Sequence, residues 1–299
     1  MAAEKFKKKV AVCSYEEAIS ANNSIYCKMV IVSEEGTQYI AYYFGYAKTD
    51  KKYFDDPEHV YEMTGNLAAD GTVKITNIDL TQDKASDIIK SKIDVDQEKL
   101  KLMESLKALL TKAKYTKLIR SVLLEHIDAV SGASMFNFPF LPHSLIKHIN
   151  NCLKVLQSIL NSEVYNGVML DIEAMVASII TYAIYRADVV NNSCLRYDPS
   201  PFAKVVGNAE STMAMLYKAI IDSGAQSNDF ICMIDIVSSI LNERFSNTLE
   251  GRIVFHIVKM DYIIQTVQLR FDSSKQDGIV NINHITDNNR VIYYPSGVS

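Results

Sequence analysis

The chain has 299 residues, of which 48% are apolar and 22% are charged, and its net charge at pH 7 is −4. These proportions are typical of a soluble globular protein and exclude a disordered or collagen-like chain. The small negative charge argues against a strong attraction of the whole chain to nucleic acid or acidic lipid, so any basic surface must be local.

The cysteines and the apolar stretches predict the compartment. The five cysteines are widely spaced and form no Cys-x-x-Cys pair, which disfavours a disulfide framework and a zinc ribbon and fits a reducing environment. No apolar run follows the N-terminal lysines, as a secretory signal would require. The longest nearly uncharged apolar stretch, Met175–Tyr185, is shorter than the roughly 18 residues of a membrane span. We therefore expect a cytoplasmic protein with no membrane partner.

The first quarter of the chain predicts β-structure. Apolar and polar residues alternate through short runs, and Asp70-Gly71 is typical of a hairpin turn. The predicted strands cover residues 9–14, 24–33, 37–44, 59–66 and 72–79. Five short strands in so few residues favour a closed barrel, because closure removes exposed sheet edges. We predict an OB-like barrel over residues 1–82.

The polar stretch 83–98 reads as a linker, and after it the apolar period changes to that of helices. Leu100, Met103, Leu106, Leu109 and Leu110 fit one face of a first helix. Further predicted helical segments cover about residues 115–130, 144–162, 170–190, 202–223, 229–243 and 249–270. We assign residues 99–278 to one helical domain and 279–299 to a tail with a hairpin around residues 287–289. The predicted fold class is therefore α+β, a five-stranded barrel followed by an all-α domain.

Several short motifs appear in the order found in one family of enzymes. Residues 25–44, IYCKMVIVSEEGTQYIAYYF, read as strand, acidic-glycine turn and strand. The helical region contains Leu145-Ile146-Lys147-His148 and later Thr248-Leu249-Glu250. In this order the chain resembles the bacterial 3′-to-5′ exoribonucleases of the YhaM type. These enzymes join an OB-fold to an HD-type phosphohydrolase domain, so the resemblance implies an HD-like helical domain.

The resemblance also implies where metal ligands would lie. The family's first histidine corresponds to His148. Its His-Asp pair falls on Tyr182-Ala183, or on Thr181-Tyr182 with a slip of one residue. The remaining positions fall on Asn208, Ser239-Ile240 and Val258, with Asp261 one helical turn further on. Because alanine, isoleucine and valine cannot bind a metal, the resemblance implies a diverged member without catalysis, metal or cofactor.

The barrel supplies candidate nucleic-acid-binding residues. Bases of single strands stack on aromatic rings while lysines follow the backbone, and OB-folds bind on strands 2 and 3. Tyr26 and Lys28 lie opposite the apolar face of their run. Tyr39 and Tyr43 alternate with the residues that we assign to the core, and Lys74 could join them from the last strand. The alternative is that these tyrosines reflect β-propensity and packing alone.

A second candidate surface is a basic stretch. Residues 99–120 carry seven basic side chains and one acidic side chain, which would concentrate phosphate affinity in one helix. The basic residues are Lys99, Lys101, Lys107, Lys112, Lys114, Lys117 and Arg120. The alternative is a solvated helix face.

The leading hypothesis is a non-catalytic protein that binds single-stranded RNA or DNA, with RNA preferred because of the family resemblance. Its helical domain would be a scaffold or a surface for homo-oligomerisation. One alternative is a divergent metal-dependent phosphodiesterase or exoribonuclease with unconventional ligands such as Asp188, Asp198 or Asp261. Another is a structural adaptor that acts through the helical domain. Strong divergence of this kind would suit the genome of a large phage.

Overall fold

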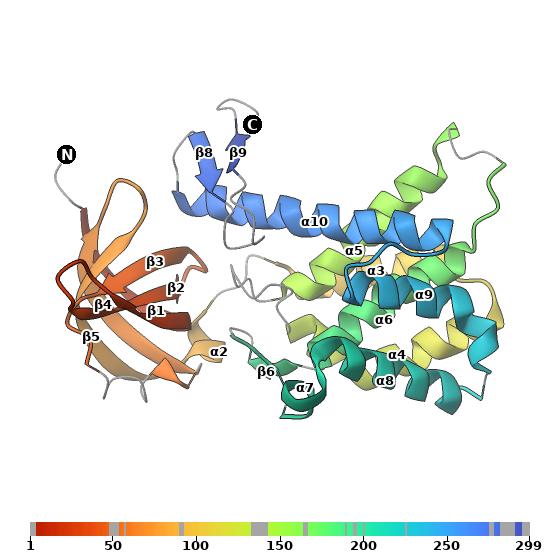
Figure 1. Cartoon of the computed structure of the whole chain (residues 1–299), viewed down its shortest axis with the longest axis horizontal. Helices are drawn as coiled ribbons and strands as arrows, with labels where there is room; N and C mark the ends of the chain where they lie inside the picture. Colours follow the sequence, from red (N-terminus) through yellow and green to blue (C-terminus); the bar gives the residue numbers. More distant parts are fainter. Residues whose placement is uncertain are drawn as a thin grey trace.

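A computed structural model of the chain describes residues 4–47, 54–56, 58–89, 93–132, 143–163, 167–188, 190–193, 196–199, 201–224, 226–274, 278–281 and 291–294. Its first part is a β-barrel and its second part is helical (Figure 1). The predicted α+β fold class is confirmed.

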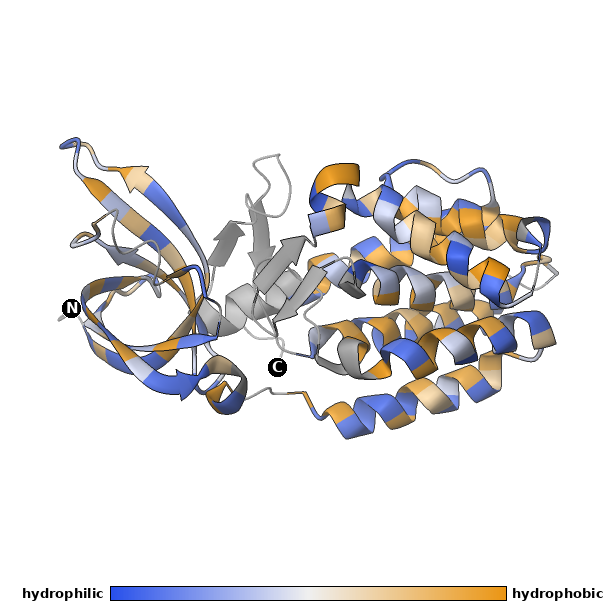
Figure 2. Cartoon of the chain, turned by 90° about the horizontal axis from the view of Figure 1, so that it is seen from below, coloured by the Kyte–Doolittle hydropathy of each residue, from blue (hydrophilic) through white to orange (hydrophobic). Residues whose placement is uncertain are grey.

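The barrel consists of β1 (Glu4–Ile19), β2 (Ile25–Ser33), β3 (Gln38–Tyr43), β4 (His59–Leu67) and β5 (Val73–Lys84). Neighbours in the sheet follow the order β1-β2-β3-β5-β4, and β4 pairs with β1 to close the barrel. All pairs are antiparallel except β3 with β5. This closed Greek-key arrangement is OB-like, and the barrel is seen nearly end-on in Figure 2.

Two clusters of buried side chains hold the barrel together. The interior contains Phe6, Met29, Ile31 and Met63, all less than a twentieth exposed. A second, smaller cluster forms on the outside, where the short helix α2 (Ala85–Ile88) places Ala85 against Val32 and Val60. The cluster thus covers the outer surface of β2 at its C-terminal end. Tyr26 and Lys28, nearer the start of β2, remain partly exposed.

The stretch assigned to a linker, residues 83–98, is more structured than we predicted. It contains the end of β5, the whole of α2 and the first turn of α3 (Val95–Leu109). Asp94 begins α3 by accepting a hydrogen bond from the backbone N–H of Gln97. Such N-caps lie in polar sequence, which explains why polarity alone suggested a linker.

The helical part contains longer helices, whose described bounds are α4 (Ala113–Gly132), α5 (Ser144–Leu160), α6 (Ile172–Asp188), α7 (Pro201–Val206), α8 (Asn208–Asp222), α9 (Ile231–Leu241) and α10 (Leu249–Ser274). A 3-10 turn, η3 (Ser227–Phe230), precedes α9. The predicted helix 202–223 is broken between α7 and α8, because Gly207 has a φ of 97° that a helix cannot contain.

Helix α6 is the centre of this region. Residues 174–185 are all buried, and α6 packs against α4, α5, α8, α9 and α10. A helix that is apolar on all sides is expected to be surrounded in this way. Orange and blue residues alternate along the helices in Figure 2, and buried apolar side chains of α4, α5, α6, α8, α9 and α10 form one cluster.

Two small antiparallel sheets complete the described structure. They pair β6 (Val190–Ser193) with β7 (Arg196–Pro199), and β8 (Gly278–Asn281) with β9 (Val291–Tyr294). We did not predict the first pair. The turn predicted around residues 287–289 in the tail lies outside the described residues. Within the described parts of the chain, no helix has both the length and the apolar character needed to cross a membrane.

Candidate nucleic-acid interface

An aromatic patch lies on the outer surface of β2 and at the end of β3. The ring of Tyr26 stacks on that of Phe44, with centroids 5.2 Å apart and planes 29° from parallel. The ring of Tyr42 lies 6.2 Å from that of Tyr26 in a tilted arrangement. Phe44 is 55% exposed, so part of its ring is accessible to a ligand. We call Tyr26, Tyr42 and Phe44 the aromatic patch.

The strand register places two lysines beside this patch. Lys28 of β2 is opposite Tyr42 of β3, and Tyr42 is in turn opposite Lys74 of the parallel strand β5. Side chains at paired positions share one face of a sheet, so both lysines lie on the same outer face as the tyrosine, one on each side of its strand. Lys28 is held by Glu16 of β1 at 2.8 Å. An incoming phosphate would therefore compete with that carboxylate.

A hollow of about 300 Å³ adjoins the patch along the same strands. Its lining consists of Ser14, Tyr15, Glu16, Lys28, Met29, Val30 and Ile40. The register of β1 and β2 shifts between Val12 and Ser14. Such a bulge re-aims the side chains that follow it. Lys28 and Glu16, which form an ion pair, both line the hollow. Since Lys28 is also opposite Tyr42, the hollow lies next to the aromatic patch.

Tyr39 and Tyr43 do not lie on this surface, so their predicted placement is wrong. Tyr39 is opposite Ile31 and Tyr43 is opposite Cys27, and both partners are in the barrel core. The ring of Tyr39 packs edge-on against Phe6, 5.2 Å away. The core position between them is the small Ala41, opposite Met29. Ile40 and Phe44 are more apolar than Ala41, so the hydropathy of β3 alone pointed to the wrong face.

The basic stretch 99–120 is not one helix. Helix α3 ends at Leu109 and α4 begins at Ala113. Glu173, at the start of α6, accepts hydrogen bonds from the backbone N–H of Lys112 and the hydroxyl of Thr111. These hydrogen bonds stabilise the turn between α3 and α4. The seven basic residues are therefore split between two helices and the turn joining them.

Several of these lysines have partners inside the helical region. Lys112 is 3.0 Å from the carboxylate of Asp171. Lys114 donates to the backbone carbonyl of Asp229, and Lys117 donates to that of Ser223, each at 2.6 Å. Ser223 follows the last residue of α8, where a cation is favourable because the helix carbonyls carry partial negative charge. Lys101 pairs with Glu98 on its own helix, while Lys107 and Arg120 are exposed and Lys99 is half-buried.

The carboxylate of Asp171 likewise has a structural task. It accepts hydrogen bonds from the Tyr115 hydroxyl and from the backbone N–H of Ala174 in the first turn of α6. Burial alone would raise the pKa of Asp171, but Lys112 and Tyr115 outweigh it and hold that pKa below its usual value. This carboxylate is thus an N-cap and an ion-pair partner.

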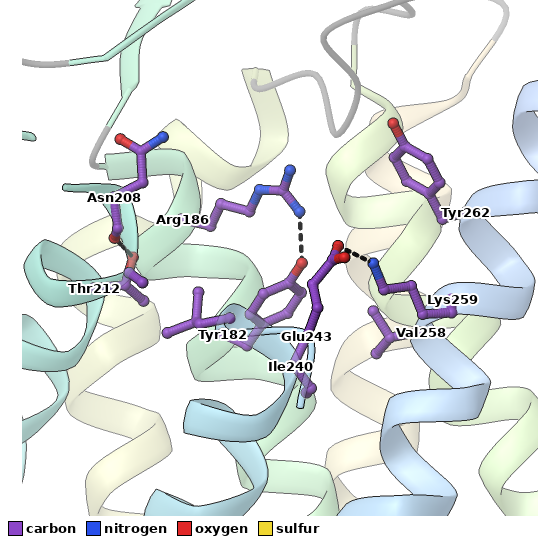
Figure 3. A pocket seen from close by; sticks show the side chains of 11 residues that line it. Tyr182, Arg186, Asn208, Thr212, Ile240, Glu243, Val258, Lys259 and Tyr262 are labelled. Atoms are coloured by element: carbon purple, nitrogen blue, oxygen red, sulfur yellow. Dashed lines mark hydrogen bonds and ion pairs between the residues drawn. The ribbon is translucent and has the colours of Figure 1, made fainter. Parts of the chain in front are cut away.

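Positions that the family resemblance matches to metal ligands lie together in the helical region. A cavity of about 270 Å³ is lined by Tyr182, Asn208, Ile240 and Val258 among others (Figure 3). The first comes from α6, and the others come from α8, α9 and α10 in turn. Four helices thus bring to one cavity four residues that are matched to the ligands of one metal site.

The chemistry of this cavity does not suit a two-metal centre. Tyr182 accepts a hydrogen bond from Arg186 at 2.5 Å, and Glu243 is ion-paired with Lys259. Figure 3 shows both pairs within the cavity. The lining contains two cations, Arg186 and Lys259, and a single carboxylate, Glu243, which is already ion-paired, whereas two divalent metals would need several imidazoles and carboxylates. His148 is not among the described residues that line this cavity, so the matched histidine adds no ligand to it.

Comparisons with known proteins leave the family open. No protein-family model matches the chain, and no curated protein matches it. A crystal structure of the mitochondrial single-stranded DNA-binding protein from S. cerevisiae is 18% identical. The match covers 28% of this chain and 99% of that one, with a TM-score of 0.23. At this identity and score the similarity does not define a function. The resemblance to exoribonucleases thus rests on the sequence pattern alone.

Proposed function

We propose that this chain binds single-stranded nucleic acid, with a preference for RNA, on the outer surface of β2, β3 and β5, and that it does not cleave the strand. The aromatic patch is the observation that carries this proposal. Stacking of a base on an aromatic ring contributes about 1–3 kcal/mol and tolerates any sequence. Phe44 is 55% exposed, and its ring neighbours that of Tyr26, which in turn neighbours that of Tyr42. The patch therefore offers stacking surface to the bases of a strand that crosses it.

The flanking lysines fit the same ligand. Lys28 and Lys74 border Tyr42 on opposite sides, so a strand crossing the patch would bring its phosphates near both ammonium groups. Each neutralised phosphate releases counterions, which makes binding weaken as salt rises. The ion pair of Lys28 with Glu16 lowers the affinity expected for this surface.

The absence of cleavage is supported by the cavity in the helical region. Of its lining residues, Tyr182, Asn208, Ile240 and Val258 offer neither an imidazole nor a carboxylate at the positions matched to metal ligands. RNA is preferred in this proposal because the pattern of the chain resembles RNA-degrading enzymes. The aromatic patch itself implies neither the absence of cleavage nor the RNA preference, so each is measured separately.

The test is fluorescence anisotropy with labelled single-stranded RNA and DNA of one sequence, at two salt concentrations, with and without Mn²⁺. The recovered probe is then run on a denaturing gel. We expect binding that weakens with salt, an intact probe and tighter binding of RNA. A probe shortened only with Mn²⁺ would overturn the non-catalytic part, and equal affinities would overturn the RNA preference.

If the protein binds neither the RNA probe nor the DNA probe, the proposal is overturned and the adaptor alternative is favoured. The helical region would then be the part to test for protein partners. Homo-oligomerisation stays a prediction, and light scattering of the same sample would measure it.

A further inference from the structure

The cavity in the helical region carries more positive than negative charge. Arg186 of α6 and Lys259 of α10 line it together with one carboxylate, that of Glu243. Figure 3 shows Arg186 and Lys259 pointing toward the middle of the cavity from opposite sides, with the Glu243 carboxylate between them. A confined space lined mainly by one sign of charge attracts ions of the other sign. We call this space the α6–α10 cavity.

The backbone holds Glu243 at the cavity in a conformation that is rare for a glutamate. Its N–H bonds to the carbonyl of Ile240, and the N–H of Arg244 bonds to that of Ser239. This pair of bonds is the Schellman motif that ends many helices, and its left-handed position is usually glycine. Glu243 takes that position with a φ of 50°, which a side chain disfavours. The end of α9 thus places a carboxylate beside Lys259.

The ion pair of Glu243 with Lys259 is easy to replace. The Lys259 and Glu243 side chains are 37% and 70% exposed, and an ion pair so accessible to water contributes little stability. A more strongly charged anion can therefore take the place of this carboxylate at little cost.

Arg186 is anchored on the inner side of the cavity. Its guanidinium donates to the hydroxyl of Tyr182 at 2.5 Å, and Tyr182 is only 4% exposed. A guanidinium carries five N–H donors in one plane, so it can hold the phenol and an anion at the same time. Tyr182 thus fixes the orientation of Arg186 toward the cavity.

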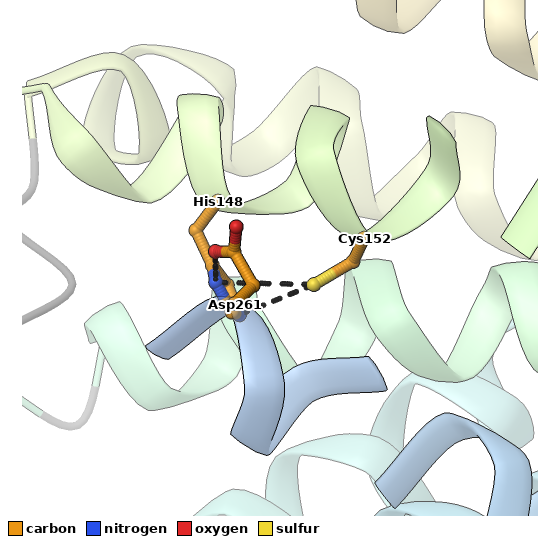
Figure 4. A group of neighbouring side chains, drawn as sticks. All are labelled: His148, Cys152 and Asp261. Carbon is orange, nitrogen blue, oxygen red and sulfur yellow. Dashed lines mark hydrogen bonds and ion pairs between the residues drawn. The ribbon is translucent and has the colours of Figure 1, made fainter. Parts of the chain in front are cut away.

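The position of Lys259 is fixed by a buried network on the same helix. Figure 4 shows His148 of α5 and Asp261 of α10 meeting between the two helices. Nδ1 of His148 lies 2.5 Å from one oxygen of Asp261. Gln265 donates to that oxygen at 2.5 Å, and Asn151 donates to the other at 2.9 Å. This closed network attaches α10 to α5 two residues beyond Lys259.

The charges of the cavity suit a phosphate group. Once Glu243 is displaced, Arg186 and Lys259 present two positive charges. A phosphate monoester carries roughly 1.5 to 2 negative charges near pH 7 and three acceptor oxygens, whereas a carboxylate balances only one of the cations. Arginine also matches the geometry of phosphate with two parallel N–H donors.

The size and the remaining lining suit a small molecule attached to that phosphate. The cavity of about 270 Å³ lies near the lower end of the roughly 300–1,000 Å³ typical of small-molecule sites. Tyr262, Ile240 and Val258 also line it. An aromatic ring and two apolar side chains thus offer contact area to an organic group.

We propose that the α6–α10 cavity binds a small phosphate monoester of the size of a nucleoside monophosphate. Its phosphate lies between Arg186 and Lys259, in the place that the Glu243 carboxylate now occupies. Glu243 is then a built-in competitor, which lowers the affinity and selects against singly charged anions. This site requires neither a metal nor cleavage, and it does not depend on nucleic-acid binding by the barrel.

The first test is equilibrium dialysis of the full chain against radiolabelled adenosine 5′-monophosphate (AMP) in a buffer free of phosphate. Unlabelled inorganic phosphate and unlabelled adenosine are the two competitors. We expect the protein to retain AMP, inorganic phosphate to compete for the site more weakly than AMP, and adenosine not to compete. Competition by adenosine equal to that by unlabelled AMP would overturn the proposal, because the phosphate would then not be recognised.

Variants assign the binding to the cavity. Lys259→Met should weaken AMP binding by about tenfold or more, because it removes a charged hydrogen-bond donor. Glu243→Gln should strengthen AMP binding several-fold, because the competing carboxylate is lost. Lys218→Met and Glu104→Gln are the matched controls. These two side chains are exposed on α8 and α3 and are not among the described residues that line the cavity, so both variants should bind AMP like the parent.

Two results would overturn the proposal independently of each other. One is a folded parent protein that retains no AMP at millimolar concentration, and this result stands even if a variant fails to fold. The other is equal AMP affinity of the parent, Lys259→Met and Glu243→Gln, with circular dichroism showing that all three are folded. AMP would then bind outside the α6–α10 cavity.

Discussion

Lys28 on β2 and Tyr42 on β3 are directly opposite each other across the antiparallel pair, and both side chains point outward from the barrel. Tyr26 and Phe44 lie on the same outer surface, with their rings stacked. The outer surface of this strand pair therefore carries three aromatic rings and one lysine. The first two predictions concern this surface.

Replacing Tyr42 and Phe44 together by alanine should weaken the binding of single-stranded RNA by about tenfold or more, since each stacked base contributes roughly 1–3 kcal/mol. Anisotropy titrations at low salt would measure the change. Tyr217→Ala is the control, because Tyr217 is 40% exposed on α8, far from the strands in sequence. Equal affinities of the double variant and the parent would remove the aromatic patch from the interface.

Replacing Glu16 by glutamine should strengthen RNA binding by several-fold. The carboxylate now holds the Lys28 ammonium at 2.8 Å, and its removal leaves that charge to a phosphate. The slope of affinity against salt should become steeper, because one more phosphate is neutralised. Glu62→Gln, which releases Lys7 elsewhere on the barrel, should change neither quantity. Unchanged binding by Glu16→Gln would mean that Lys28 does not contact the strand.

Replacing Lys117 by methionine should lower the stability of the helical region and leave RNA affinity unchanged. Its ammonium donates to the Ser223 carbonyl at the end of α8. Loss of a cation at a helix C-terminus costs about 0.3–1 kcal/mol when it is exposed. Urea unfolding measures the loss, with Lys107→Met on the exposed side of α3 as the control. A large loss of RNA affinity would restore Lys117 to the interface.

Replacing Gly65 by alanine should destabilise the barrel by about 1–3 kcal/mol or more. A Cβ at Gly65 would lie 2.2 Å from the backbone carbonyl oxygen of Lys74, an atom that cannot move without disturbing β5. The register of β4 and β5 shifts at this glycine. At Gly45 a Cβ would instead meet the ring of Tyr43 at 3.0 Å, so Gly45→Ala is the milder control. Equal unfolding midpoints in denaturant would contradict this interpretation of the bulge.

The stability of the helical region should fall in acid through Asp171. The folded state holds the pKa of this carboxyl below its usual value, which in an unfolded chain is about 3.9. The stabilisation is therefore complete above that pH and is lost as the pH falls through the folded pKa. The difference in unfolding free energy between the parent and Asp171→Asn should shrink below about pH 4.

Much of the fold was predictable from the sequence because it depends on local patterns. The alternation in residues 24–33 predicted which side of β2 is buried, since Cys27, Met29 and Ile31 are all in the core. The change of period after the barrel predicted the long helices. Helix starts were harder to predict: Asp94 and Gly207 precede helices at places where composition suggested a linker or a continuous helix.

The contacts of the candidate surfaces could not be predicted from the sequence. Residues 99–120 are basic in sequence, but the fold directs Lys112, Lys114 and Lys117 to partners more than fifty residues away. In the same way, His148 and Asp261 are 113 residues apart and meet only because α5 packs against α10. Patterns within a short stretch of sequence cannot predict contacts between residues so far apart in the chain.

By itself, the sequence determined the order of a β-rich region and a helical region, the inward face of β2 and the absence of histidines between His148 and His256. Only the tertiary structure decided that Tyr42 and Phe44, instead of Tyr39 and Tyr43, face outward. The physical reason is that barrel closure fixes the register of β3 against β2. The side chain opposite Met29 then had to be the small Ala41, because the interior of a small barrel has a fixed volume to fill.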